Sequence, residues 1–184
     1  MPPEIKTERA VMLDGAIALI DERGEQALSA RNLAHRLGIS TQPVYREFGD
    51  MDGVRRAALE RGLEVFAEYL AGEALDQSVR YVRFAGEHPR LFSFIFRGKQ
   101  IESGGMDELS RKLMDGTDIV DRLQAITGLP REKVYRVHLF VWMAIHGLAV
   151  LSSENKIAFE ARELEQFTKD ITRGMAEYYR GRDQ

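Results

Sequence analysis

An N-terminal segment, residues 29–50, carries the side chains best suited to binding another molecule. Its second half predicts a short helix whose outer face carries Thr41, Gln42, Tyr45 and Arg46. Glutamine can bond two atoms of adenine, threonine can contact the thymine methyl group, and tyrosine and arginine can reach phosphates. Ser40 is a good N-cap for this helix, and exposed N–H groups at a helix N-terminus attract a phosphate. The segment therefore predicts contact with double-stranded DNA.

The same segment has the spacing of two short helices that meet at a tight turn. The helices are expected at about 29–36 and 40–47, and a glycine turn separates them as in a helix-turn-helix. Gly38 can supply the positive φ that the turn needs. Ile39 is expected to fill the angle between the helices, and Val44 to face inward.

A recognition helix of about two turns reaches few base edges. This predicts a homodimer on a palindromic operator, with half-site centres about 34–36 Å apart. Ser29, Arg31 and Ser40 complete the predicted DNA-binding residues. Residues 29–61 hold six arginines against four carboxylates, although the whole chain has a net charge of −3. We therefore expect modest, salt-sensitive DNA affinity.

Two motifs resemble one known family. The stretch from Leu13 to Val54, with Leu33-Ala34, Leu37-Gly38-Ile39-Ser40, Pro43-Val44-Tyr45 and Phe48, resembles the N-terminal domain of TetR-family transcriptional regulators. Trp142-x-x-x-His146-Gly147-Leu148, with Phe84 and His88-Pro89-x-Leu91-Phe92, is similar to the TetR regulatory domains of the Trp/His-Gly (WHG) subgroup. The resemblance implies a ligand-responsive regulator, a repressor that a small, mainly apolar effector releases from its operator.

The chain departs from the family pattern at two positions. TetR-like sequences commonly carry a histidine before the aromatic residue at 48 and a lysine at the start of the next helix, where this chain has Glu47 and Met51. Glu47 would repel a phosphate and Met51 carries no charge. The alternative prediction is therefore a helical ligand-binding module with weak or lost DNA binding.

Helical spacing of apolar residues continues along nearly the whole chain and predicts an all-α fold of about nine helices. We expect a three-helix DNA-binding domain at 1–51 and a helical effector-binding and dimerisation domain at 52–184, connected by a helix at 52–71. The apolar run 91–96 could be a strand, but a buried helical turn is favoured because no partner strand is predicted.

Aromatic residues of the C-terminal part are candidates for an effector pocket, although each would also suit a plain core. They are Phe66, Phe84, Phe92, Phe96, Trp142 and His146. His138 shares a helix face with Trp142 and His146, but the spacing supplies no further ligand, so neither a metal nor a cofactor is predicted.

The last two helices are the predicted dimer interface, because each carries an apolar stripe. The candidate residues are Val141, Ala144, Leu148, Leu164, Phe167, Ile171 and Met175.

Composition excludes several other classes of protein. The 184 residues include no cysteine, which excludes disulfides, thiolate nucleophiles and cysteine metal sites. No apolar run approaches the roughly 20 residues that span a bilayer, and no signal peptide is visible, so we expect a cytoplasmic protein without a membrane partner. An all-α enzyme is the remaining rival, but the sequence carries none of the common catalytic signatures.

Overall fold

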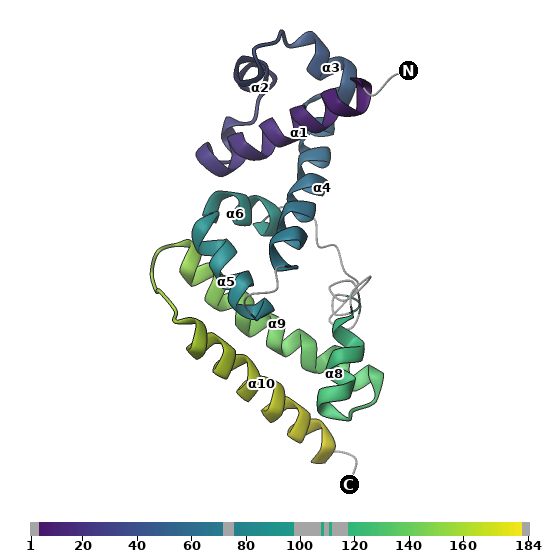
Figure 1. The fold of residues 1–184 in the computed structure, drawn as a ribbon, viewed down its shortest axis with the longest axis vertical. Coiled ribbons are helices and arrows are strands. Elements are labelled where there is room, and N and C mark those ends of the chain that lie inside the picture. Colours follow the sequence, from purple (N-terminus) through teal and green to yellow (C-terminus); the bar gives the residue numbers. More distant parts are fainter. Residues whose placement is uncertain (1–3, 72–75, 98–107, 109–110, 112–117, 182–184) are drawn as a thin grey trace. The chain divides into compact units, whose positions relative to one another are not determined.

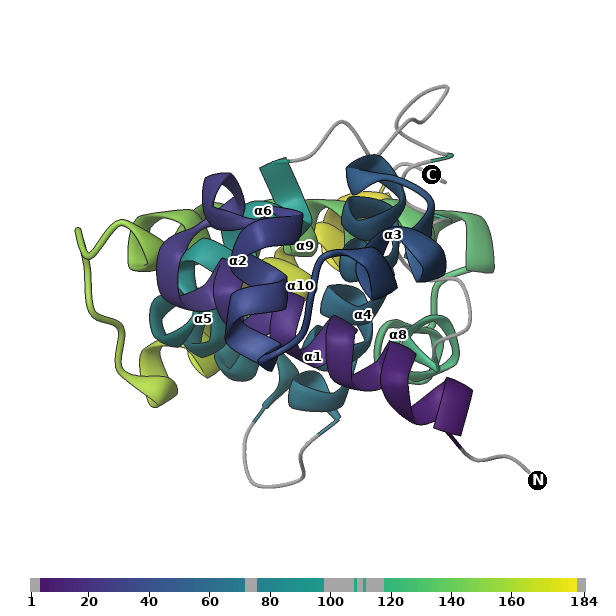
Figure 2. The ribbon, with the colours of Figure 1, turned by 90° about the horizontal axis from the view of Figure 1, so that it is seen from above.

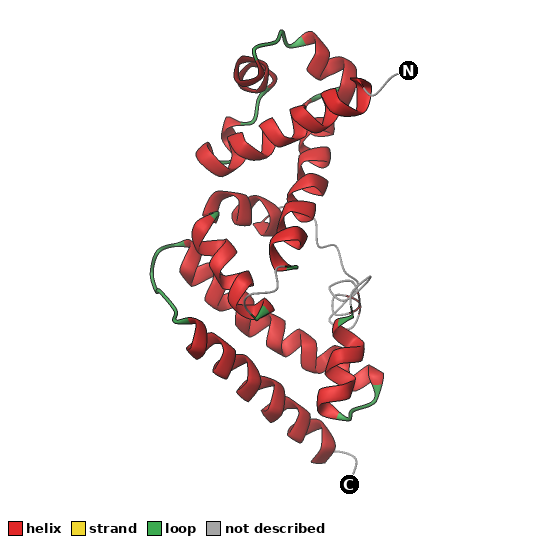
Figure 3. Cartoon of the chain, in the orientation of Figure 1, coloured by secondary structure: helices red, strands yellow, loops and turns green. Residues whose placement is uncertain are grey.

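The computed structural model describes residues 4–71, 76–97, 108, 111 and 118–181. Over these ranges the chain forms nine α-helices and one short 3-10 helix, with no strand (Figures 1 and 3). The predicted all-α fold is confirmed. The helices are α1 (Glu4–Arg23), η1 (Glu25–Ala27), α2 (Ala30–Leu37), α3 (Gln42–Phe48), α4 (Met51–Leu70), α5 (Gln77–Glu87), α6 (Pro89–Arg97), α8 (Ile119–Thr127), α9 (Arg131–Ser153) and α10 (Ala161–Gly181).

The chain groups into two compact units, and the division falls inside α5. Unit 1 comprises residues 1–73 and 84–98, and unit 2 comprises residues 74–83 and 99–184. The expected boundary between residues 51 and 52 stays a prediction. The run 91–96 lies in helix α6, as favoured, and Pro89 is the first residue of that helix, where its missing N–H costs no hydrogen bond.

Unit 1 is built around the inner faces of its helices. Ile20 of α1, Leu33 of α2, Val44 of α3 and Val54 of α4 are almost completely buried. α1 packs against α2 and α4, and α6 packs against α1 and α4. The buried apolar residues of α2 and α3 therefore hold these short helices in place, since helices of about two turns have little stability of their own.

The turn between α2 and α3 confirms one expectation and corrects another. Gly38 has a φ of 67° and ends α2, as predicted, and Figure 2 shows the chain passing from α2 through this turn into α3. Ile39 does not fill the angle between the helices. Its N–H bonds to the carbonyl of Ala34 at 3.0 Å to close the turn, and its side chain is 38% exposed.

The start of α3 also differs from the expectation. The N-cap is Thr41 rather than Ser40, and its side chain makes no capping hydrogen bond. Pro43 is the second residue of the helix, and it has no N–H for a cap to bind. Ser40 lies exposed in the turn before the helix.

Unit 2 contains α8, α9 and α10. Val120, Leu129, Val134 and Val137 form a buried cluster with residues of α10, and Gly128 ends α8 with a φ of 66°. Apolar residues spaced from Leu109 to Ile126 predict a helix that Gly128 ends, and the structure describes this helix only from Ile119 onward. The remainder of that prediction lies outside the described residues.

Helix α9 corrects the expectation about apolar runs. Among the described helices, α9 is long and apolar enough, by length and composition alone, to span a bilayer. An 18-residue window of this helix has a mean hydropathy of 1.5. Core helices of soluble proteins pass the same test. α9 packs against α8 and α10, yet only 28% of that window is buried, so an apolar face of α9 remains exposed in one chain.

The junction between α3 and α4 generates a stability prediction. Asp50 caps α4 by accepting from the N–H of Gly53 at 2.7 Å, and a Cβ atom at Gly53 would collide with the carbonyl oxygen of Phe48. We expect Gly53→Ala to lower the free energy of unfolding by about 1–3 kcal/mol in urea denaturation. Gly62→Ala in the same helix is the control, because its Cβ would meet Ile95 at an ordinary 3.4 Å. Equal effects of the two substitutions would contradict this account.

Candidate nucleic-acid interface

Helix α3 presents the residues that the sequence assigned to DNA. Thr41, Gln42, Tyr45 and Arg46 are all exposed, and 47% of Tyr45 is accessible. Val44 lies on the opposite face and is completely buried. The exposed ring of Tyr45 is accessible to another molecule.

At the start of α2 the predicted residues have different environments. Ser29 is half-buried and is the N-cap of α2, because its hydroxyl oxygen accepts from the N–H of Asn32 at 3.2 Å. Arg31 is exposed on the first turn. Ser29 therefore holds the start of α2, while the Arg31 side chain is accessible to a phosphate.

Several other arginines of unit 1 are held by carboxylates. Arg36 of α2 makes two hydrogen bonds of 2.8 Å to Glu22 of α1, and this contact lowers the pKa of Glu22. Arg55 lies 3.0 Å from Asp52 and 3.9 Å from Glu25. These contacts place part of the arginine charge of residues 29–61 within the protein rather than toward a ligand.

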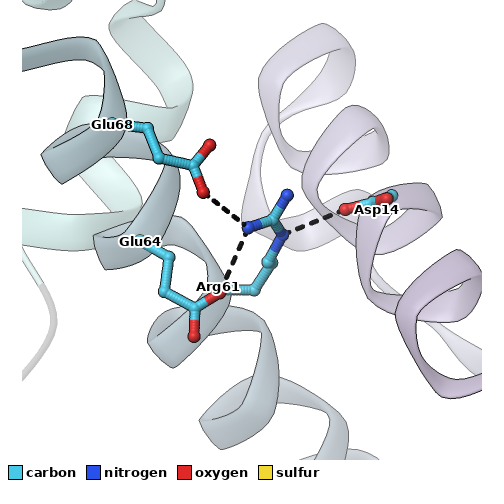
Figure 4. A network of polar contacts seen from close by, with 4 residues as sticks. All are labelled: Asp14, Arg61, Glu64 and Glu68. Carbon is cyan, nitrogen blue, oxygen red and sulfur yellow. Dashed lines mark hydrogen bonds and ion pairs between the residues drawn. The ribbon is translucent and has the colours of Figure 1, made fainter. Parts of the chain in front are cut away.

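Arg61 of α4 is the centre of a network with three carboxylates (Figure 4). Its Nε donates to Asp14 of α1 at 3.0 Å, and its Nη1 donates to Glu64 at 3.1 Å and to Glu68 at 3.3 Å. The three carboxylates raise the pKa of Arg61. The network ties α1 to α4, the helix that follows the helix-turn-helix.

Glu47, which the sequence comparison marked as a departure, is also paired. Arg9 of α1 donates to the Glu47 carboxylate at 3.0 Å and to its backbone carbonyl at 3.4 Å. The Arg9 guanidinium also lies over the ring of Phe48, 4.7 Å from its centre. The negative charge of Glu47 is thus offset by an arginine 38 residues away. Met51, the second departure, is half-buried at the start of α4.

The predicted effector residues do not all fall in one unit. Four belong to unit 1, where Phe66 contacts Phe84 and Phe96 edge-to-face at 5.0 and 5.3 Å, and Phe92 lies 4.8 Å from Phe96. Trp142 and His146 belong to unit 2. The phenylalanines form an aromatic core cluster in unit 1, so each prediction of a pocket role remains untested.

In unit 2, Trp142 and His146 of α9 belong to a cluster of partly buried polar side chains. The two rings stack at 5.1 Å, and Nδ1 of His146 lies 2.9 Å from the hydroxyl of Tyr81. Burial raises the pKa of Tyr81 and lowers that of His146, so both groups are neutral near pH 7. His138, one helical turn before Trp142, has a buried Nδ1 with no hydrogen-bond partner in the described part of the chain.

A pocket that the sequence did not indicate lies at the start of α9. Its volume is about 370 Å³, and it is lined by Arg111, Glu132, Lys133, Tyr135, Arg136 and Tyr179. The N-terminal turns of α9 do alternate cations with an aromatic residue, but this pattern is common on exposed helices. Over the described ranges no three potential metal ligands come together.

The predicted dimer residues differ in exposure. Phe167 is 40% exposed, Leu164 is buried within unit 2, and Val141 and Met175 pack against its core cluster. Ala144, Leu148 and Ile171 are half-buried. Three apolar residues outside the predicted set, Phe140, Met143 and Tyr178, are 40%, 37% and 51% exposed on the same two helices. Phe140 and Met143 lie on one stripe of α9 with Gly147, and Tyr178 lies on one stripe of α10 with Gly174.

The unpartnered histidine generates a pH prediction. Burial lowers the pKa of His138 from 6.5 to about 4, so the unfolded chain takes up this proton first as the pH falls. The stability that the neutral imidazole contributes is therefore fully present above pH 6.5 and is lost as the pH falls toward 4. We expect His138→Leu to remove roughly 2–3 kcal/mol of the acid-induced loss of stability in this window, measured by urea denaturation. His35→Leu, on the exposed face of α2, is the control, and an unchanged pH dependence for His138→Leu would refute the prediction.

Comparison with known proteins agrees with this architecture. Residues 12–58 match the model of the tetR family of bacterial regulatory proteins, and residues 74–175 match that of the tetracyclin repressor-like C-terminal domain. An uncharacterized HTH-type transcriptional regulator of Mycobacterium tuberculosis is 27% identical over 156 residues, which cover 79% of this chain and 70% of that protein. The Trp/His-Gly subgroup is not confirmed by these matches.

Two solved structures from Rhodococcus sp. RHA1 share the fold. One is a protein of unknown function, with a TM-score of 0.68 and 24% identity, and the match covers 91% of this chain and 95% of that one. The other is a TetR-like transcriptional regulator, with a TM-score of 0.56, 18% identity and coverage of 98% and 97%. Since the C-terminal family model alone matches more than half of the chain, this protein belongs to the TetR family of transcriptional regulators, with an N-terminal DNA-binding domain and a C-terminal ligand-binding domain.

Proposed function

We propose that this chain is a homodimeric repressor that binds a palindromic operator through α3 and leaves it when a small molecule binds the C-terminal domain. One observation carries the proposal. Thr41, Gln42, Tyr45 and Arg46 are exposed on α3, while Val44 between them is buried. A short helix anchored on one side and polar on the other is what entry into the major groove requires.

The proposed roles follow from side-chain chemistry. Gln42 and Thr41 contact base edges, and Tyr45 and Arg46 contact phosphates. Arg31 and Ser40 contact phosphates beside α3. Ser29, whose hydroxyl oxygen already accepts a hydrogen bond, acts by fixing the start of α2.

Dimerisation is proposed through α9 and α10. The support is the apolar face that one chain leaves exposed, with Phe140 and Met143 on α9 and Phe167 and Tyr178 on α10. Gly147 and Gly174 lie on these helices, and a Cβ atom at either would meet nothing within 4 Å, so a second chain could approach closely. Four such helices around a two-fold axis would bury both stripes.

The effector is proposed to be small and mainly apolar, with Trp142 and His146 among the residues that recognise it. Both imidazoles of α9 are neutral near pH 7, which suits an uncharged ligand. We propose regulation rather than catalysis, and a cytoplasmic location where the operator lies. The pairing of Glu47 with Arg9 favours retained DNA binding over the alternative of a module that has lost it.

The direct test is to select duplexes from a random pool with the full chain and measure binding by fluorescence anisotropy. We expect a palindromic site that binds two chains and an affinity that falls steeply with salt. A small molecule that binds the protein should then weaken operator binding, and the operator should weaken its binding by the same factor. Failure to enrich any duplex would overturn the proposal.

Substitutions on the interface should separate its two kinds of contact. Arg31→Ala should weaken binding to all duplexes alike, and it should reduce the slope of log K against log salt concentration by about 1. Gln42→Ala should instead relax the preference at one base pair in each half-site, with a loss of about 1–3 kcal/mol in discrimination against the wrong base. Arg122→Ala, exposed on α8, is the control and should change neither quantity. A uniform loss for Gln42→Ala would show that it does not read a base.

A further inference from the structure

The contact between Arg9 and Glu47 joins the first helix to the end of the recognition helix. Arg9 donates to the Glu47 side chain at 3.0 Å and to its backbone carbonyl at 3.4 Å, and its guanidinium covers Phe48. We call these three residues the clasp. One arginine thereby contacts a charge, a carbonyl and a ring on the last turn of α3, a combination with more geometric definition than a simple surface ion pair.

The clasp acts on a short helix that packs against α4 and α2. α3 has seven residues, of which Val44 is buried. Its Thr41 cap makes no side-chain hydrogen bond, and Gly49 follows with a φ of 79°. A helix this short does not hold its own direction, so tertiary contacts at both ends determine how its outer face is presented.

Glu47 carries a negative charge, which is unexpected on a helix that binds DNA. A carboxylate on a DNA-binding helix repels phosphates unless a cation offsets it, and 25% of the Glu47 side chain is accessible. We propose that Glu47 is a positioning residue for DNA binding, which holds α3 at its working angle through Arg9 and touches no nucleotide itself. This inference rests on the proposed function of α3 as the operator-reading helix.

The proposal and simple electrostatics predict opposite signs for one substitution. Glu47→Ala removes a negative charge from the interface, and electrostatics alone would raise the affinity for the selected operator. If the clasp positions α3, the same change should lower that affinity about five- to twentyfold. Glu47→Gln keeps an oxygen that can accept from Arg9, so it should retain an affinity near that of the unchanged protein.

Matched variants make the test specific to the pair. Arg9→Ala should weaken binding at least as much as Glu47→Ala does, because it also removes the contacts to the Glu47 carbonyl and to Phe48. The double variant should bind no more weakly than Arg9→Ala alone, because the side-chain pair is already lost there. Exchanging the charges, Arg9→Glu with Glu47→Arg, should restore affinity. Glu60→Ala, which removes an exposed carboxylate from α4, is the control and should leave the affinity unchanged or slightly higher. All affinities are measured well below the unfolding temperature of each variant, so that a loss of stability does not contribute.

Hydrogen exchange without DNA provides a second, independent readout. Exchange of the α3 amides should be faster in Arg9→Ala and Glu47→Ala, and unchanged in Glu60→Ala and throughout α9. Raised affinity for Glu47→Ala, or unchanged α3 exchange in both clasp variants, would overturn the inference. If no duplex is selected by the unchanged protein, the proposed function fails, while the exchange arm still decides whether the clasp holds α3.

Discussion

The structure of the DNA-binding part depends on the burial of the inner faces of α2 and α3 against their neighbouring helices. Leu33 and Val44 are completely buried, although the helices that carry them have eight and seven residues. Burying one such side chain contributes about 1.5–3 kcal/mol, which is comparable to what so short a helix lacks on its own. Because these faces point inward, the opposite face of α3 is necessarily exposed. The exposed polar residues that define the interface are a consequence of this packing.

Ion pairs between helices add direction to this packing. Arg36 joins α2 to α1, Arg61 joins α4 to α1, and Arg9 joins α3 to α1. Isolated surface pairs contribute at most about 1 kcal/mol each, so their value here is in fixing the angles between helices rather than in stability. They also offset part of the negative charge in unit 1 and, equally, part of its arginine charge. Much of the negative charge in unit 1 faces an arginine of the same unit.

Local chemistry was predictable from the sequence, and contacts between distant residues were not. The positive φ of Gly38 and the end of α8 at Gly128 follow from residue type and were expected. Residue type also offered either Asp50 or Asp52 as the cap of α4, and the cap is Asp50. Ile39 and Ser40 were assigned wrongly, because the missing N–H of Pro43 and the hydrogen bond that closes the turn change the start of α3. Glu47 was interpreted as a defect, since no periodicity links it to Arg9. On α9 and α10 the stripes were recognised, but the sequence could not determine which side of each stripe packs inside one chain.

The central claim is that the outer face of α3, with the start of α2, contacts the operator. Hydrogen–deuterium exchange of the full chain, with and without the selected duplex, tests it most directly. The account predicts that DNA slows exchange over residues 29–46 and leaves the amides of α8 unchanged. Slowed exchange confined to unit 2, or none over residues 29–46 in a saturated complex, would contradict it.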